Sequence, residues 1–111
     1  MLYGLFMLRI NKYIFYEVCD KNMDLYEDFL RMFQIEYISC VKTLDKKESC
    51  ESIRFHTHKL IGILSYFQGA NDEIIYRCRM LLALPKYTTP LNDYSYMVDQ
   101  IVQFDRSVFG M

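Results

Sequence analysis

Apolar residues recur along this chain at intervals of three and four, and no stretch alternates apolar and polar side chains over the length of a strand. Spacing of three and four places apolar side chains on one face of an α-helix, whereas strict alternation would favour a half-buried strand. No Asn-Gly or Asp-Gly pair marks a tight hairpin turn either. The pattern therefore predicts an all-α protein.

Helix-breaking residues divide the chain into helices. Glycine occurs four times and proline twice, and the segment LPKYTTPL, with Pro85 and Pro90, is the clearest loop. We expect Asn22 and Thr89 to cap helix starts, and Gly69 to take the left-handed position after a helix end. The predicted helices cover about 3–18, 22–44, 48–67, 71–83 and the segment from Pro90 onward. This organisation predicts a single domain over 1–111, in which an antiparallel four-helix bundle (22–111) follows an additional N-terminal helix (1–20).

The composition excludes several classes of protein. A chain of 111 residues with 52% apolar and 16% aromatic residues has enough apolar side chains for one core and is not disordered. The net charge of −1 gives no electrostatic reason to expect nucleic acid or an anionic membrane as a partner. Cys19, Cys40, Cys50 and Cys78 have no metal-site spacing, so we expect reduced thiols and no bound metal. The N-terminal apolar run is too short to span a bilayer, and we expect a cytoplasmic protein.

The only two histidines of the chain lie in the stretch HTHKLIG, residues 56–62. On a helical wheel with Leu60 at zero, His56 lies about 40° away, at the edge of the apolar face. His58 lies about 160° away on the same wheel, near the middle of the opposite face. The apolar face itself consists of Ile53, Thr57, Leu60, Ile63, Leu64 and Phe67. We therefore expect His56 to be a hydrogen-bonded packing residue and His58 to face solvent.

The surroundings of His58 are unusual for a solvent-facing helix strip. Gly62, one turn later, costs about 1 kcal/mol relative to alanine in the middle of a helix. It removes side-chain bulk beside the imidazole, and Phe55 and Ile61 add an apolar rim. These features are typical of a docking site. A structural interpretation is also possible, in which His58 is an ordinary surface histidine and Gly62 marks a contact between helices. The pattern alone favours neither the functional nor the structural interpretation.

The same residues resemble a known family. HKLIG, from His58 to Gly62, is similar to the H-x-L-K-G core of histidine-containing phosphotransfer (HPt) domains. LYEDFLRMFQIEY (25–37), the lead-in ESIRFHTH and the following FQGANDEIIYRCRMLL also look like the corresponding HPt segments. The resemblance covers about residues 22–83.

This resemblance implies a phosphorelay intermediate in two-component signal transduction. His58 would accept a phosphoryl group from the aspartyl phosphate of a receiver domain and pass it to another receiver, with Leu60 as its buried anchor. The partners implied are response regulator receiver domains and a hybrid sensor histidine kinase, with the chain itself monomeric. The receiver would bring Mg²⁺, so the chain needs no cofactor and no pocket of its own. The implied docking residues are Arg54, Phe55, Lys59, Ile61, Gly62 and Ser65, and the weaker phosphate-orienting residues are Arg77 and Arg79.

The chain departs from the family pattern at two places. Ile61 stands where the family usually has a lysine that helps to neutralise phosphate. The polar residue that often faces the imidazole from the next helix falls near Met80–Leu82, and none of these residues is polar. Two alternatives to a phosphoryl carrier therefore stay open: a module that binds receiver domains without carrying phosphate, and an unrelated helical interaction protein. The chain has no motif of an enzyme with its own catalytic site.

Overall fold

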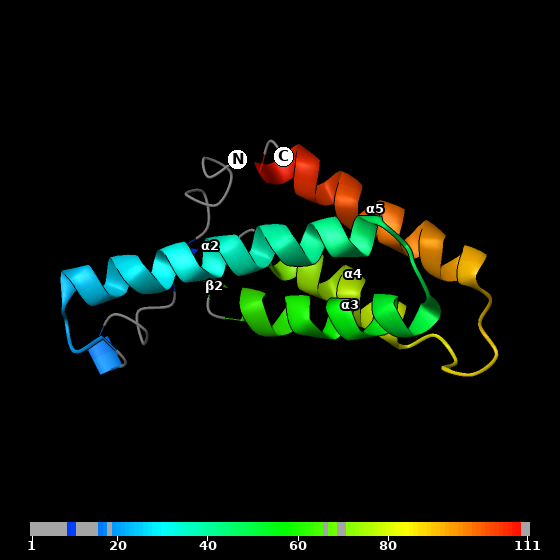
Figure 1. Cartoon of the computed structure of the whole chain (residues 1–111), viewed down its shortest axis with the longest axis horizontal. Helices are drawn as coiled ribbons and strands as arrows, with labels where there is room; N and C mark the ends of the chain where they lie inside the picture. The colour runs from blue at the N-terminus through cyan, green and yellow to red at the C-terminus, as the bar shows by residue number, and fades with distance from the viewer. Residues whose placement is uncertain (1–8, 11–15, 18, 66, 69–70, 110–111) are drawn as a thin grey trace.

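The protein is described by a computed structural model that covers residues 9–10, 16–17, 19–65, 67–68 and 71–109 (Figure 1). Its helices are α2 (Met23–Asp45), α3 (Cys50–Leu64), α4 (Asn71–Leu82) and α5 (Leu91–Phe109). Each helix contributes to one shared core, and α3 contacts all three of the others. The prediction of a helical protein with four main helices is confirmed for the described part of the chain.

Short polar side chains cap the starts of α2 and α3. The side-chain oxygen of Asn22 accepts from the Leu25 N–H at 3.1 Å, as predicted, and the Ser49 hydroxyl accepts from the Ser52 N–H at 3.0 Å. These contacts satisfy backbone donors that have no partner in the first turn. Thr89 differs from the prediction, because its hydroxyl donates to the Pro85 carbonyl at 2.6 Å and closes the loop before α5.

The core is formed by the faces that the apolar spacing predicted. Tyr37, Leu60, Leu64, Ile74 and Tyr94 are among its fully buried side chains. Tyr26 and Leu30, nearer the start of α2, are only half-buried. The remaining buried apolar residues of the four helices are Phe33, Cys40, Val41, Leu44, Ile53, Ile63, Cys78, Leu81, Val98, Ile101 and Val102.

Within the predicted helix over 3–18, the described residues Arg9–Ile10 are not helical. Arg9–Ile10 form a short strand, β1, which pairs antiparallel with β2 (Phe67–Gln68). The third helix consequently ends at Leu64 and not near residue 67, since the backbone of β2 bonds across to β1. Tyr16 and Glu17 lie in a helical turn, while the rest of the predicted N-terminal helix and the predicted helix end at Gly69 lie outside the described residues.

All four cysteines are free thiols, and three of them are buried. Burial raises the pKa of Cys40 to about 11 and that of Cys78 to about 12, from an ordinary value near 9. The Cys40 thiol also donates to the His56 carbonyl at 3.1 Å. Both thiols are therefore protonated and poorly nucleophilic at neutral pH.

We expect a thiol reagent at pH 8 to label Cys50 in the native protein well before the other three cysteines. Cys50 is half-buried, whereas Cys19, Cys40 and Cys78 are almost fully buried. Mass spectrometry of the labelled protein, with a denatured sample as the control for full labelling, measures this order. Rapid native labelling of Cys78 would contradict the burial described.

The same pKa shifts predict a loss of stability at alkaline pH. Thiols of the unfolded chain ionise near pH 9, and the buried thiols resist ionisation up to about pH 11 for Cys40 and about pH 12 for Cys78. The stabilising contribution of the protonated thiols is thus complete below pH 9 and is lost as the pH rises toward those values. Urea unfolding at pH 7, 9 and 10.5 checks this, and replacing Cys78 with alanine should flatten the alkaline decline.

Candidate functional site

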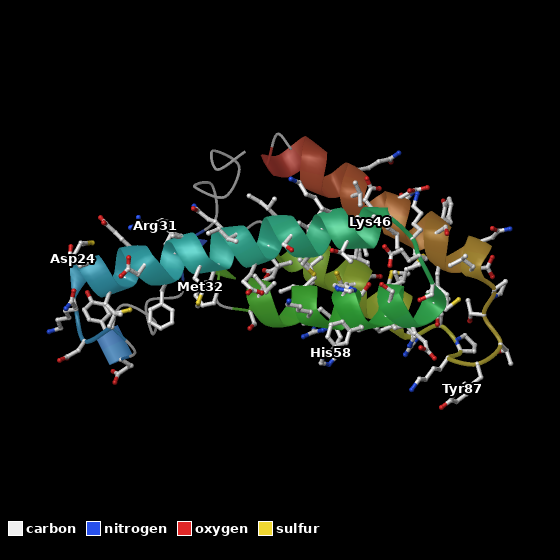
Figure 2. All side chains as sticks on the ribbon, in the orientation of Figure 1. Asp24, Arg31, Met32, Lys46, His58 and Tyr87 are labelled. Carbon is white, nitrogen blue, oxygen red and sulfur yellow. The ribbon has the colours of Figure 1, made fainter. Side chains whose placement is uncertain are left out.

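His58 lies on the outward face of α3, near the middle of the helix (Figure 2). Its side chain is exposed, and no hydrogen bond joins its ring to another of the described residues. The flanking residues Thr57 and Leu60 are fully buried on the opposite face. The helix is thus fixed by its inner face, while the imidazole stays accessible on the outer one.

His56 is a packing residue, as the helical wheel predicted. It is half-buried, and its Nδ1 lies 2.8 Å from the Ser52 carbonyl oxygen one turn earlier. At this distance from a carbonyl, Nδ1 must carry the proton and donate it. The ring also meets Phe55 edge to face, with centroids 5.1 Å apart. The two histidines therefore differ in environment: His56 is half-buried and bonded within its own helix, whereas His58 is exposed.

Gly62 follows His58 by one helical turn and is exposed. A Cβ atom built on Gly62 would have no atom within 4 Å, apart from its immediate surroundings in the helix. No close contact with another described helix therefore requires glycine at this position. The open space beside the imidazole is the remaining structural consequence of Gly62.

Arg54, which the resemblance implies as a docking residue, is half-buried, and its guanidinium bonds within the protein. Its Nη1 donates to the Tyr94 hydroxyl at 2.9 Å and to the Leu84 carbonyl at 3.2 Å, and its Nη2 donates to the Leu82 carbonyl at 3.2 Å. The last carbonyls of a helix have no partner within the helix and attract cations. We call this set of bonds the Arg54 clamp; it joins α3 to the end of α4, the following loop and α5.

Other predicted docking residues are partly engaged by the protein itself. Phe55 is 65% exposed and forms the apolar surface that was expected beside His58. Ile61 is half-buried and packs against the core, so it adds little to that surface. The Lys59 ammonium lies 3.2 Å from the Glu36 carboxylate of α2, and the Ser65 hydroxyl donates to the Gly62 carbonyl at 2.6 Å.

Arg77 and Arg79 lie on different sides of α4. Arg77 pairs with Glu73 at 3.2 Å, and it lies about 140° around the helix from Leu82. Arg79 is exposed and lies about 60° from Leu82. Leu82 lies beside His58 on the surface, so Arg79 is closer than Arg77 to the side of α4 that borders His58. Neither arginine lines the hollow beside His58.

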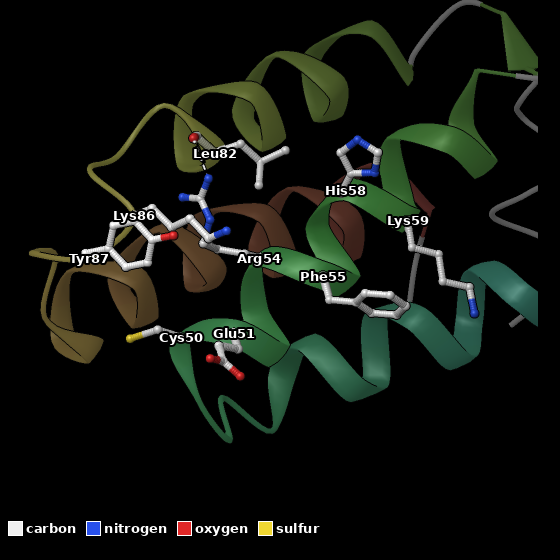
Figure 3. A pocket seen from close by; sticks show the side chains of 9 residues that line it. All are labelled: Cys50, Glu51, Arg54, Phe55, His58, Lys59, Leu82, Lys86 and Tyr87. Atoms are coloured by element: carbon white, nitrogen blue, oxygen red, sulfur yellow. Dashed lines mark hydrogen bonds between the residues drawn. The ribbon is translucent and has the colours of Figure 1, made fainter.

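A groove of about 510 Å³ opens next to His58 (Figure 3). The resemblance implied a site without a pocket, and the structure differs by having a groove beside His58. One wall comes from α3, with Cys50, Glu51, Arg54, Phe55, His58 and Lys59. The other wall comes from the end of α4 and the loop after it, with Leu82, Lys86 and Tyr87. Lys86 and Tyr87 had no signal in the sequence beyond their place in a loop between two prolines.

The groove combines apolar surface with basic side chains. Phe55 and Leu82 supply apolar surface. The lining includes three basic side chains, those of Arg54, Lys59 and Lys86, and one carboxylate, that of Glu51. Within the described ranges, no group of three His, Cys, Asp or Glu side chains could hold a metal ion. In the same part of the chain, no helix has the length and apolar character that crossing a membrane requires. The apolar and basic residues that line the groove suit a partner with apolar and acidic groups.

No protein-family model, curated protein or solved structure matches this chain. The function must accordingly be argued from the residues of the site.

Proposed function

We propose that this protein is a phosphorelay intermediate of the histidine phosphotransfer kind, built as an antiparallel four-helix bundle. In this proposal His58 accepts a phosphoryl group from the aspartyl phosphate of one receiver domain and delivers it to another. The observation that carries the proposal is the exposed His58 imidazole, free of hydrogen bonds to described residues and beside the open space at Gly62. The likeness of HKLIG to the H-x-L-K-G core supports it independently of the geometry.

The transfer needs only a nucleophile from this chain. The lone pair of a neutral imidazole nitrogen attacks phosphorus, and the P–O bond to the aspartyl group breaks. The electron pair of that bond stays with the departing carboxylate, while the new N–P bond holds the phosphoryl group on His58. The receiver supplies Mg²⁺ and its own acidic residues. The reverse step onto a second receiver follows the same path.

The packing of α3 suits such a role. An exposed reactive side chain is presented well when its own helix is held rigidly. Thr57 and Leu60 are buried on the inner face, and the Arg54 clamp ties the preceding turn to two further elements. The backbone that carries His58 is thereby restrained on both sides of the histidine.

The proposal is tested with a receiver domain that carries aspartyl phosphate in the presence of Mg²⁺. Wild-type protein, His58→Ala and His56→Gln are each incubated with this receiver, whose phosphoryl group is labelled. The label transferred to each protein is then tested for stability to acid and to base. We expect acid-labile, base-stable label on wild type and on His56→Gln, and none on His58→Ala. Label that persists in His58→Ala would refute the assignment.

A module that docks receiver domains without carrying phosphate is the second candidate. It is favoured by the shortage of free positive charge at His58: Ile61 packs into the protein, and Arg54 and Lys59 are already bonded. Measurable binding of a receiver domain to wild type, together with no label on His58 from any phosphorylated receiver, would favour this candidate over the first.

A further inference from the structure

We infer that Lys86 and Tyr87, on the loop between α4 and α5, form the wall of the groove that selects the partner of His58. The occupant is the acidic surface of a receiver domain, with an acidic side chain at Lys86 and an apolar one over Phe55 and Leu82. This inference rests on the proposed function and adds the residues that decide which receiver docks.

The first support is position. Lys86 and Tyr87 line the same groove as His58, although they lie more than twenty residues later in the chain (Figure 3). Both are exposed, and Tyr87 is exposed to 90%. A partner that reaches His58 along the groove therefore meets the loop as well as α3.

The second support is the state of the basic side chains. The guanidinium of Arg54 is bonded to two carbonyls and a hydroxyl, and the ammonium of Lys59 is paired with Glu36. Lys86 makes no ion pair with any of the described residues, and its ammonium lies over the Tyr87 ring at 5.4 Å. Among the basic groups of the groove, Lys86 is thus the one most available to an acidic partner.

The third support is the fixed geometry of the loop. Arg54 bonds the Leu82 and Leu84 carbonyls, while the backbone and the hydroxyl of Thr89 both donate to the Pro85 carbonyl, at 3.2 and 2.6 Å. Only residues 86–88 lie between the anchored residues Pro85 and Thr89. The backbone at Lys86 and Tyr87 is therefore anchored on both sides, as a surface that discriminates between partners needs.

Charge complementarity identifies the occupant. The protein as a whole has a net charge of −1, yet basic residues outnumber acidic ones in the groove. Receiver domains that carry aspartyl phosphate present an acidic cluster at the reacting carboxylate. Charged residues at the edge of an interface act mainly on the association rate and on the choice of partner. A charge at Lys86 should therefore affect docking while leaving the reactivity of the imidazole unchanged.

The experiment compares two phosphoryl donors. One is a receiver domain phosphorylated on its aspartate, and the other is phosphoramidate, a small donor that needs no docking surface. The variants are Lys86→Glu, Lys86→Arg and Tyr87→Ala, with Arg31→Glu on the exposed side of α2 as a control that changes the net charge equally. Initial rates of His58 labelling are measured from 50 to 300 mM NaCl.

We expect Lys86→Glu to lower kcat/KM for transfer from the receiver roughly tenfold at 50 mM NaCl, with the deficit shrinking as salt rises. Lys86→Arg and Arg31→Glu should stay within about twofold of wild type, and Tyr87→Ala should show a deficit that salt does not remove. Labelling by phosphoramidate should be equal in all the proteins.

Equal receiver transfer in wild type and Lys86→Glu, with His58 labelled, would overturn this inference and leave the proposed function intact. A lower rate of phosphoramidate labelling in Lys86→Glu would also overturn it, since the lysine would then act on the imidazole and not on docking. No transfer from any receiver to wild type, with normal phosphoramidate labelling of His58, would overturn the proposed function and this inference together.

Discussion

Replacing Gly62 with tryptophan is expected, on the proposed function, to lower phosphotransfer from a receiver domain to His58 by about 100-fold or more. A side chain one helical turn after His58 lies next to the imidazole on the helix surface. The Cβ position of Gly62 opens onto free space, so the indole can project outward without disturbing the core. It would then occupy the volume through which the partner approaches. Transfer rates measured with a phosphorylated receiver check this result.

Gly62→Ala is the matched control for the tryptophan variant. An alanine Cβ meets no atom within 4 Å, and alanine is favoured over glycine inside a helix by about 1 kcal/mol. We therefore expect Gly62→Ala to raise the free energy of unfolding by about that amount and to reduce transfer far less than tryptophan does. Wild-type transfer in Gly62→Trp would show that the partner does not approach over this part of α3.

Replacing Arg54 with methionine is expected to lower the free energy of unfolding by about 2 to 4 kcal/mol. Methionine keeps much of the apolar stem but removes the donors of the Arg54 clamp. The Tyr94 hydroxyl belongs to a fully buried residue, the Leu82 carbonyl lies at the end of α4, and the Leu84 carbonyl lies in the loop that follows. Leaving such groups without a partner is costly, because they had exchanged water for the guanidinium. Urea unfolding monitored by circular dichroism measures the change.

Arg79→Met provides the comparison for the Arg54 variant. Arg79 is exposed on α4, and such surface substitutions usually change stability by no more than about 0.5 kcal/mol. Tyr94→Phe should lower the free energy of unfolding by an amount between those of Arg79→Met and Arg54→Met, since it removes only one acceptor of the clamp. Equal unfolding midpoints for Arg54→Met and Arg79→Met would mean that the clamp contributes nothing to stability.

The helical period was enough to separate the two histidines from the sequence. A turn of about 100° per residue places neighbours that differ by two positions on different faces. The structure has His56 half-buried and bonded within its own helix, and His58 exposed. The same period found the inner face of α3, where Ile53, Thr57, Leu60, Ile63 and Leu64 are all buried.

The role of Arg54 could not be read from the period, because its partners come from elsewhere in the chain. A wheel places Arg54 on the face of His58, but the side chain is long enough to reach the end of α4. Its acceptors lie 28 to 40 positions later in the sequence. The groove was missed for the same reason, since Lys86 and Tyr87 reach it only when the loop packs beside α3.

The N-terminal segment shows how a local pattern can be overridden. The apolar run near the start of the chain is compatible with a helix, yet Arg9–Ile10 pair with Phe67–Gln68. Pairing with a distant strand contributes bonds that no helical window can anticipate. The same pairing shortens α3 relative to the predicted range, because β2 begins soon after its end.

The Arg54 clamp has a consequence for the order in which the site is completed. Residues 50–64 could form the histidine helix from local contacts, whereas closing the clamp requires Tyr94 of the last helix to be in place. Contacts between distant parts of a chain carry a loop-closure cost and tend to form late. A chain that ended between Leu84 and Leu91 would keep His58 and the Arg54 acceptors at Leu82 and Leu84, but it would lose the bond to Tyr94. On the proposed function, recognition of a partner would then depend on folding having reached α5.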